Sequence, residues 1–225
     1  VLKKSKPSHL YVNNGAGFLI FKFFPKKFKI IEQVIGPRRF MPDSIFIDSV
    51  SSKYFDNSIA DYSLDLRARM EEAEWKYADL ILCPSNFVYD LMIKSGVHEN
   101  KLKLLNYGVN TKLFKICWEK NRDYNKLRDL NILFVGEVGL RKGVAYLIES
   151  LLDIKIGYKC KFVGSNKLTK DFNNENIEFV GVIDKDKITD YYLWADVLII
   201  PSLWEGSATV IYEATASGLP VIASK

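Results

Sequence analysis

The sequence predicts an α/β fold with two similar domains, each built on a parallel β-sheet. Short β-rich apolar runs alternate with amphipathic helical patterns along the 225 residues, which is typical of βαβ units. Most of these runs are continuous, as expected for strands that are buried on both faces of a parallel sheet. A weak internal repeat, YADLILCPS at 77–85 and WADVLIIPS at 194–202, predicts that one structural unit is used twice.

The elements follow from the period of the apolar residues and from the flanking turn signals. The expected strands are 9–14, 28–34, 78–85, 101–108, 131–136, 160–164, 176–181, 195–202 and 220–224. The expected helices are 62–77, 86–95, 143–153, 186–194 and 207–217. The last helix stops at SGLP, where glycine and proline end it.

A charged segment without a clear strand separates the two predicted domains. It is KICWEKNRDYNKLRDL at 115–130, just after the turn-like NYGVN. We therefore expect an N-terminal domain at 1–115, a linker at 116–130 and a C-terminal domain at 131–225. Because the chain starts at Val1 and stops at Lys225 directly after a strand-like run, we expect both ends to be truncated.

Composition excludes several classes of function. The net charge of +5 is too small to indicate nucleic-acid binding, and no recognition motif for nucleic acid is present. Because the chain has only two histidines, His9 and His98, a histidine-rich metal site is excluded. Neither has a visible serine or cysteine partner of the kind that a hydrolase needs. The widely spaced Cys83, Cys117 and Cys160 predict reduced core thiols. With no signal peptide and no membrane-spanning run, we expect a cytoplasmic protein.

The segment 18–29, FLIFKFFPKKFK, allows two interpretations. It is apolar, aromatic and basic, and Glu32 is the one acidic residue among positions 1–40. Such a segment could contact an anionic membrane surface peripherally. It could equally be a core helix that ends in a solvated turn at Pro25.

The stretch EGSATVIYE at 205–213 places two carboxylates around a predicted helix start. Glu205 follows a strand, at the sheet edge where ligands bind in open parallel sheets. Ser207 is the expected N-cap, and a helix start suits phosphate or sugar oxygens. Gly206 leaves room for a ligand, and Glu213 could accept two hydrogen bonds from a ribose diol. Alternatively, Glu205 interacts with the helix dipole and Glu213 is solvated.

Two further loops contain candidate residues. GEVGLRKG at 136–143 is glycine-rich but is neither GxGxxG nor a P-loop. Its Arg141 and Lys142 suit a diphosphate, although a polar connecting loop is the alternative. In DKD at 184–186, Asp184 or Asp186 is expected to cap the following helix rather than to bind a metal.

Several stretches together resemble glycosyltransferase family 4, the retaining nucleotide-sugar transferases with the GT-B fold. They cover roughly 70–225, in the order ADLILCPSNFVYDLM, YGVNTKLF, FVGEVGLRKGVAYLIESLL, IEFVGVI and ADVLIIPSLWEGSATVIYEATASGLPVIAS. The two glutamates followed by EATASGLPVIA form the most specific part. The resemblance implies two Rossmann-like domains that face a cleft, with the donor bound mainly by the C-terminal domain.

The resemblance also implies roles for individual residues. Glu213 matches the glutamate that binds the nucleotide ribose, and Glu205 matches the one near the donor sugar hydroxyls. The Gly206–Ser207 backbone would approach the sugar and phosphates, and Gly136 would lie in the donor-binding loop. Arg141 or Lys142 would hold the diphosphate and stabilise the departing charge. No metal and no other cofactor is expected.

Two departures from the family pattern matter. Many members have arginine where this chain has Glu137, and many have a histidine that 29–39 lacks. The glycine-rich start of the N-terminal domain and the closing C-terminal helices are not found. Whether this fragment is active by itself therefore stays open.

We expect transfer of a sugar from a UDP-, GDP- or similar nucleotide sugar to a glycan or lipid-linked glycan, with retention of configuration. The protein would work in the cytoplasm, with peripheral contact at the inner face of the membrane. Two alternatives stay open. One is a non-catalytic nucleotide-sugar- or glycan-binding protein of this fold. The other is a sugar-nucleotide epimerase, against which the spacing of the two glutamates argues.

Overall fold

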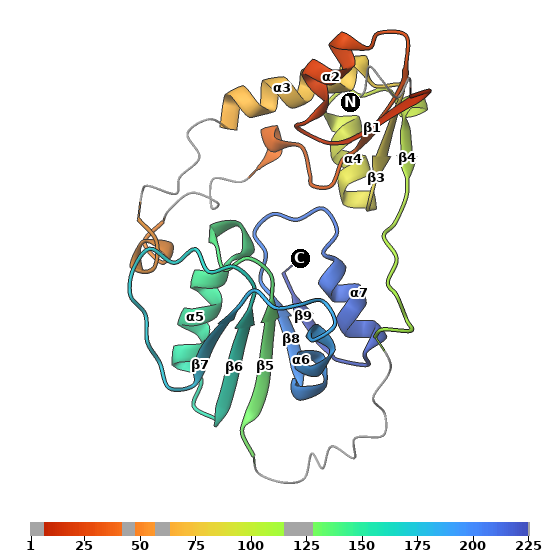
Figure 1. Cartoon of the computed structure of the whole chain (residues 1–225). Helices are drawn as coiled ribbons and strands as arrows, with labels where there is room; N and C mark the ends of the chain where they lie inside the picture. The colour runs from red at the N-terminus through yellow and green to blue at the C-terminus, as the bar shows by residue number, and fades with distance from the viewer. Residues whose placement is uncertain (1–6, 42–47, 57–63, 115–127, 225) are drawn as a thin grey trace. The chain divides into compact units, whose positions relative to one another are not determined.

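The computed structural model divides the chain into two compact α/β units, shown in Figure 1. It describes residues 7–41, 48–56, 64–114 and 128–224. The first unit is Val1–Pro42, Asp61–Tyr107 and Trp204–Ser207, and the second is Asp43–Ala60, Gly108–Leu203 and Ala208–Lys225. The chain therefore passes between the units several times.

The first unit is a four-stranded parallel sheet in the order β1-β2-β3-β4. Its core includes the fully buried Phe21, Ile31, Ile81 and Met92. Ser85 is the N-cap of α4, and its hydroxyl accepts the Val88 N–H, so the first turn of the helix is capped. The elements are β1 (His9–Asn13), α2 (Gly17–Phe23), β2 (Phe28–Glu32), η1 (Arg38–Phe40), α3 (Leu64–Tyr77), β3 (Leu80–Cys83), α4 (Asn86–Lys94), η5 (Glu99–Lys101) and β4 (Leu102–Leu104).

The second unit is a five-stranded parallel sheet in the order β7-β6-β5-β8-β9. From β5 the chain continues to β6 and β7 toward one side of the sheet, and β8 and β9 lie on the other side of β5. The carboxyl edge between β5 and β8 is therefore a topological switch point, where open α/β sheets bind ligands. The elements are β5 (Leu130–Val135), η6 (Leu140–Lys142), α5 (Val144–Asp153), β6 (Tyr158–Val163), β7 (Ile177–Gly181), α6 (Ile188–Trp194), β8 (Val197–Ile200), α7 (Thr209–Ala216) and β9 (Val221–Ala223).

The predicted α/β fold with parallel sheets is confirmed. Within the described ranges, every expected strand and helix is present, with ends shifted by a few residues. The segment 18–29 contains α2, which ends at Phe23 ahead of Pro25 and buries Phe21 completely. The helix interpretation of this segment is therefore confirmed, while the membrane interpretation remains a proposal. Most of the expected linker lies outside the described residues, and Leu130 already belongs to β5.

Two predicted helix caps are wrong. The N-cap of α7 is Ala208, with no side-chain cap, because Ser207 belongs to a loop that groups with the first unit. The N-cap of α6 is Lys187, also without a side-chain cap. A turn precedes that helix, in which Lys187 pairs with the Asp184 carboxylate at 3.2 Å.

The predicted reduced thiols are confirmed for two cysteines. Cys83 and Cys160 are free and buried. Burial raises the pKa of each thiol to about 12, so neither forms the reactive thiolate at neutral pH. Cys117 lies outside the described residues.

A short segment from the predicted N-terminal domain packs in the core of the second unit. Phe55 is fully buried there, and the Tyr54 ring meets Phe172 edge-on at 5.5 Å. The Tyr54 hydroxyl donates to Glu149 on α5 at 2.5 Å. The segment includes η3 (Ser51–Lys53) and therefore forms part of the second unit.

Replacing Phe55 by alanine is expected to lower the free energy of unfolding of the second unit by about 3–5 kcal/mol, because it leaves a cavity in a closed core. Urea unfolding followed by amide exchange in β5 and β6 measures the loss. Phe40→Ala is the control, since Phe40 is 39% exposed and should cost under about 1 kcal/mol. Equal stability of Phe55→Ala and wild type would contradict this packing.

Candidate functional site

Three backbone loops of the second unit meet at the carboxyl edge of its sheet. A Cβ on Gly143 would lie 2.0 Å from the Pro201 carbonyl oxygen, which connects the loops after β5 and β8. A Cβ on Gly164 would lie 1.9 Å from the Gly136 carbonyl oxygen, which connects the loops after β5 and β6. Gly143 is also left-handed, with φ of 65°. Only glycine allows these approaches, so the switch point is lined by closely packed backbone.

The two predicted phosphate-binding cations lie in this loop cluster. Arg141 and Lys142 belong to η6, and the Leu203 N–H donates to the Arg141 carbonyl at 2.8 Å. The Cε atom of Lys142 lies 3.7 Å from the position of a Cβ on Gly136, so its aliphatic stem covers that glycine. The structure therefore brings Gly136, Arg141 and Lys142 together at the switch point.

Two further polar side chains lie near this edge, and only Ser202 was not singled out from the sequence. The hydroxyl of Ser202, just after β8, is buried and has no hydrogen-bond partner among the described residues. The signal available for it was its place at a strand end. Glu137 is exposed, and its carboxylate folds back over Gly139.

Glu213 lies on α7 in the second unit and is half-buried. Its Oε2 accepts a hydrogen bond from the Tyr192 hydroxyl at 2.7 Å. Burial, together with this carboxylate, raises the pKa of Tyr192, so the phenol stays a donor. Within the described part of the chain, Oε1 of Glu213 makes no hydrogen bond. The carboxylate is thus oriented through one oxygen, and the other can accept a ligand hydroxyl.

Glu205 is placed differently from Glu213, because Trp204–Ser207 groups with the first unit. Trp204 is 8% exposed and donates its indole N–H to the Gly36 carbonyl at 3.2 Å. Its ring meets Phe87 edge-on at 5.3 Å. The structure therefore assigns the two glutamates of EGSATVIYE to different units. A large apolar residue in a polar loop was the one signal for this in the sequence.

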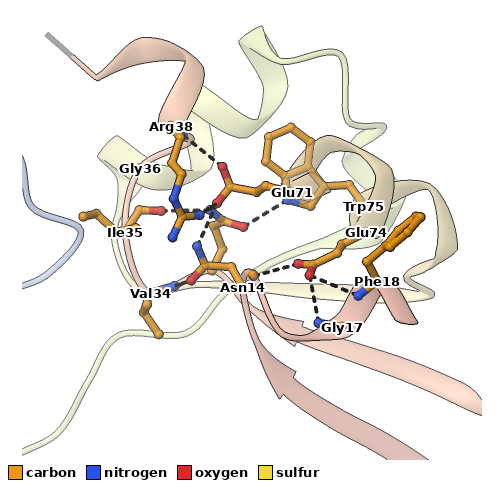
Figure 2. A network of polar contacts seen from close by, with 12 residues as sticks. Asn14, Gly17, Phe18, Val34, Ile35, Gly36, Arg38, Glu71, Glu74 and Trp75 are labelled. Carbon is orange, nitrogen blue, oxygen red and sulfur yellow. Dashed lines mark hydrogen bonds and ion pairs between the residues drawn. The ribbon is translucent and has the colours of Figure 1, made fainter. Parts of the chain in front are cut away.

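The first unit contains a buried polar network that sequence reasoning missed (Figure 2). Glu71 and Glu74 on α3 are both 0% exposed. They accept hydrogen bonds from the loops that follow β1 and β2. Their spacing on one helix face, beside Trp75, was the available signal.

The histidines and acidic residues were considered as metal ligands, and no metal site was expected. Within the described residues, no group of three or more His, Cys, Asp or Glu side chains could hold a metal ion. His9 is exposed and meets the Phe28 ring edge-on at 5.6 Å. His98 is exposed at the start of η5, where Nδ1 accepts the Asn100 N–H. No helix among the described residues has the length and apolar character needed to cross a membrane.

The C-terminal part of the chain is similar to a known protein family. Residues 118–225 match the family described as glycosyl transferases group 1. This match covers just under half of the chain. The matched residues include the loop cluster with Arg141 and Lys142, as well as Glu205 and Glu213.

Two relatives show the range of similar proteins. A 41.2 kDa protein of the cps region of Klebsiella pneumoniae is 30% identical over 158 residues, which are 66% of this chain and 43% of that protein. Sulfoquinovosyl transferase SQD2 of Arabidopsis thaliana is 28% identical over 66% of this chain and 31% of its own length. The chain thus spans less than half the length of either relative.

Solved structures confirm the predicted GT-B fold. Sucrose-phosphate synthase of Thermosynechococcus elongatus matches with a TM-score of 0.72 at 20% identity, over 99% of this chain and 57% of that chain. Anabaena HepE in complex with UDP-glucose matches with a TM-score of 0.67 at 18% identity, over 97% of this chain and 60% of that chain. At such identities the likeness concerns the fold alone.

Proposed function

We propose that this chain belongs to a glycosyltransferase that moves a sugar from a nucleotide-diphosphate donor to a glycan or lipid-linked glycan, with retention of configuration. The loop cluster at the switch point between β5 and β8 carries this proposal. There, closely packed glycine backbone lies beside Arg141 and Lys142, within the residues that match the group 1 family. The HepE complex with UDP-glucose supports a nucleotide sugar as the donor.

The donor roles follow from the chemistry of each group. Arg141 and Lys142 would hold the diphosphate, because the planar guanidinium of arginine and the compact ammonium of lysine both pair well with phosphate oxygens. The Gly136 backbone would approach the phosphates without steric hindrance. Glu213, held by Tyr192 through one oxygen, would accept hydrogen bonds from the ribose. Glu205 would accept hydroxyls of the donor sugar, with the Gly206–Ser207 backbone beside it.

The reaction breaks the bond between the sugar C1 and the diphosphate oxygen and forms a bond from C1 to the acceptor oxygen. The acceptor hydroxyl loses its proton, and a nucleoside diphosphate leaves with an added negative charge. Cations beside the departing diphosphate stabilise the transition state more than they stabilise the bound donor, and so they lower the barrier. This role falls to Arg141 and Lys142.

Transfer is tested with the complete gene product that contains this chain, incubated with UDP- and GDP-sugars and a lipid-linked glycan fraction. We expect release of nucleoside diphosphate that depends on the acceptor, and a product whose anomeric proton shows the donor configuration. A non-catalytic protein would bind the donor without releasing nucleotide. An epimerase would convert the donor without acceptor, and either result would refute the proposal.

We also propose that α2 and the turn after it contact the inner face of an anionic membrane. Leu19 and Phe23 are 60% and 74% exposed, and the lysines around them are Lys22, Lys26 and Lys27. Exposed apolar side chains flanked by lysines suit an anionic lipid surface. The buried Lys29 holds the turn through its ammonium, which donates to the carbonyls of Pro25 and Lys27 at 3.0 and 2.8 Å.

Replacing Phe23 by serine is expected to weaken binding to anionic vesicles by about tenfold, because one aromatic side chain no longer enters the lipid. Co-sedimentation with phosphatidylglycerol–phosphatidylcholine vesicles, and with phosphatidylcholine alone, measures it. Val182→Ser is the matched control, since Val182 is 78% exposed on the second unit. Equal binding of Phe23→Ser and wild type would refute this contact.

A further inference from the structure

The loop that contains Glu205 is fixed by a short backbone segment of the first unit, residues 34–36. A Cβ on Gly36 would lie 2.5 Å from the Trp204 ring, and one on Gly206 would lie 2.2 Å from the Val34 carbonyl oxygen. The Gly206 carbonyl also accepts the Ser85 hydroxyl at 2.6 Å. Because these contacts leave no space for a side chain, the position of Trp204–Ser207 depends on where the 34–36 segment lies.

The 34–36 segment is in turn held by polar side chains beside it (Figure 2). The Gln33 side-chain amide donates to the Ile35 carbonyl at 3.0 Å, and the Val34 N–H donates to Asn14 Oδ1 at 3.3 Å. The Trp75 indole N–H donates to Gln33 Oε1 at 3.0 Å. Gln33 is fully buried, so each of these partners must be satisfied within the protein.

Glu71 connects these groups. Its Oε1 accepts from Asn14 Nδ2 at 2.7 Å, from Gln33 Nε2 at 2.8 Å and from Arg38 Nη1 at 3.0 Å. Its Oε2 accepts from the Arg38 backbone N–H at 2.9 Å. One buried carboxylate therefore fixes residues on both sides of the 34–36 segment.

We propose that Glu71 is a positioning residue that sets the place of Glu205 through the 34–36 segment. This inference rests on the proposed function, in which Glu205 contacts the donor sugar. Removing the Glu71 charge would let the 34–36 segment shift, and the Trp204–Ser207 loop would shift with it. Glu71 itself is buried and lies on α3, so it acts without touching the substrate.

Glu74 provides a matched control on the same helix. It is equally buried, and it accepts three backbone N–H groups from the loop before and at the start of α2. These donors are Gly15 at 2.8 Å, Gly17 at 2.8 Å and Phe18 at 3.1 Å. Among the described residues, Glu74 makes no hydrogen bond to the 34–36 segment, so its loss should lower stability without moving Trp204.

Glu71→Gln tests the proposal, because both oxygens of Glu71 accept hydrogen bonds. In either orientation of the glutamine amide, its NH₂ group faces an N–H donor and cannot accept from it. The readout is solvent exchange of the Trp204 indole N–H in the 225-residue chain, assigned with Trp204→Phe. We expect exchange at least about tenfold faster in Glu71→Gln, and within about twofold of wild type in Glu74→Gln. Gly36→Ala, which displaces the indole directly, should match Glu71→Gln.

Equal exchange in Glu71→Gln and wild type would overturn the proposal, as would an equal rise in Glu71→Gln and Glu74→Gln. If Glu71→Gln does not fold, Glu71→Asp replaces it, because it keeps the carboxylate on a shorter side chain. It should raise the exchange rate of the Trp204 indole N–H by less than Gly36→Ala does. In the complete gene product, Glu71→Gln should lower kcat/KM for the donor by about tenfold, because the displaced Glu205 no longer contacts the donor sugar. If no transfer activity exists, the proposed function fails, and the indole exchange still decides whether Glu71 holds the loop.

Discussion

Replacing Glu213 by alanine is expected to weaken binding of the nucleotide-sugar donor by about 100-fold, because hydrogen bonds from a ribose diol to a carboxylate are charge-assisted. The Tyr192 hydroxyl already fixes one oxygen of this carboxylate at 2.7 Å. The loss therefore falls on an acceptor that is oriented before the ligand arrives. Isothermal titration of UDP- and GDP-sugars into the 225-residue chain measures the affinity.

Two controls separate the carboxylate from its surroundings. Tyr192→Phe keeps Glu213 charged and removes only the hydroxyl that orients it, so the donor affinity should fall by less than about tenfold. Glu178→Ala removes an exposed glutamate of β7 that pairs with Lys161, and the affinity should not change. Equal donor binding by Glu213→Ala and wild type would refute the ribose role.

The second large effect is expected for Gly143→Ala. The added Cβ would lie 2.0 Å from the Pro201 carbonyl, at a residue whose φ is 65°. Left-handed strain and the steric overlap should together lower the free energy of unfolding by about 3 kcal/mol. Because this contact connects the loops after β5 and β8, donor affinity should fall as well. Thermal unfolding and donor titration measure the two effects.

Gly181→Ala isolates the steric contact. Gly181 also has a positive φ, of 83°, but no heavy atom lies within 4 Å of the position of its Cβ. It should therefore show only the left-handed strain, about 1 kcal/mol, with donor affinity unchanged. Equal losses in the two variants would show that the contact with Pro201 does not matter.

The sequence predicted the sheets well because their signals are local. Continuous apolar runs such as ADLILC and NILFVG contain enough β-branched and aliphatic residues to identify buried strands. Several of the loops that follow these strands begin with glycine or proline, as at Pro84, Gly136 and Pro201. The placement of Arg141 and Lys142 at a strand end followed from the same pattern, since the loop directly follows β5.

The features that the sequence did not predict depend on partners far along the chain. Glu71 and Glu74 lie on a charged helix, and Glu71 is buried against Asn14, Gln33 and Arg38. Phe55 packs in a core whose first strand, β5, begins at Leu130. The assignment of Glu205 to the first unit depends on Gly36 and Ser85. No local pattern encodes such contacts.

One measurement tests the central claim most directly: binding of a nucleotide-diphosphate sugar to the wild-type chain, mapped residue by residue from ¹H–¹⁵N spectra. The proposed donor site predicts saturable binding of a UDP- or GDP-sugar, with the largest shifts at 136–143 and at the start of α7. Two results would contradict it. One is no binding of any nucleotide sugar, and the other is shifts confined to the first unit.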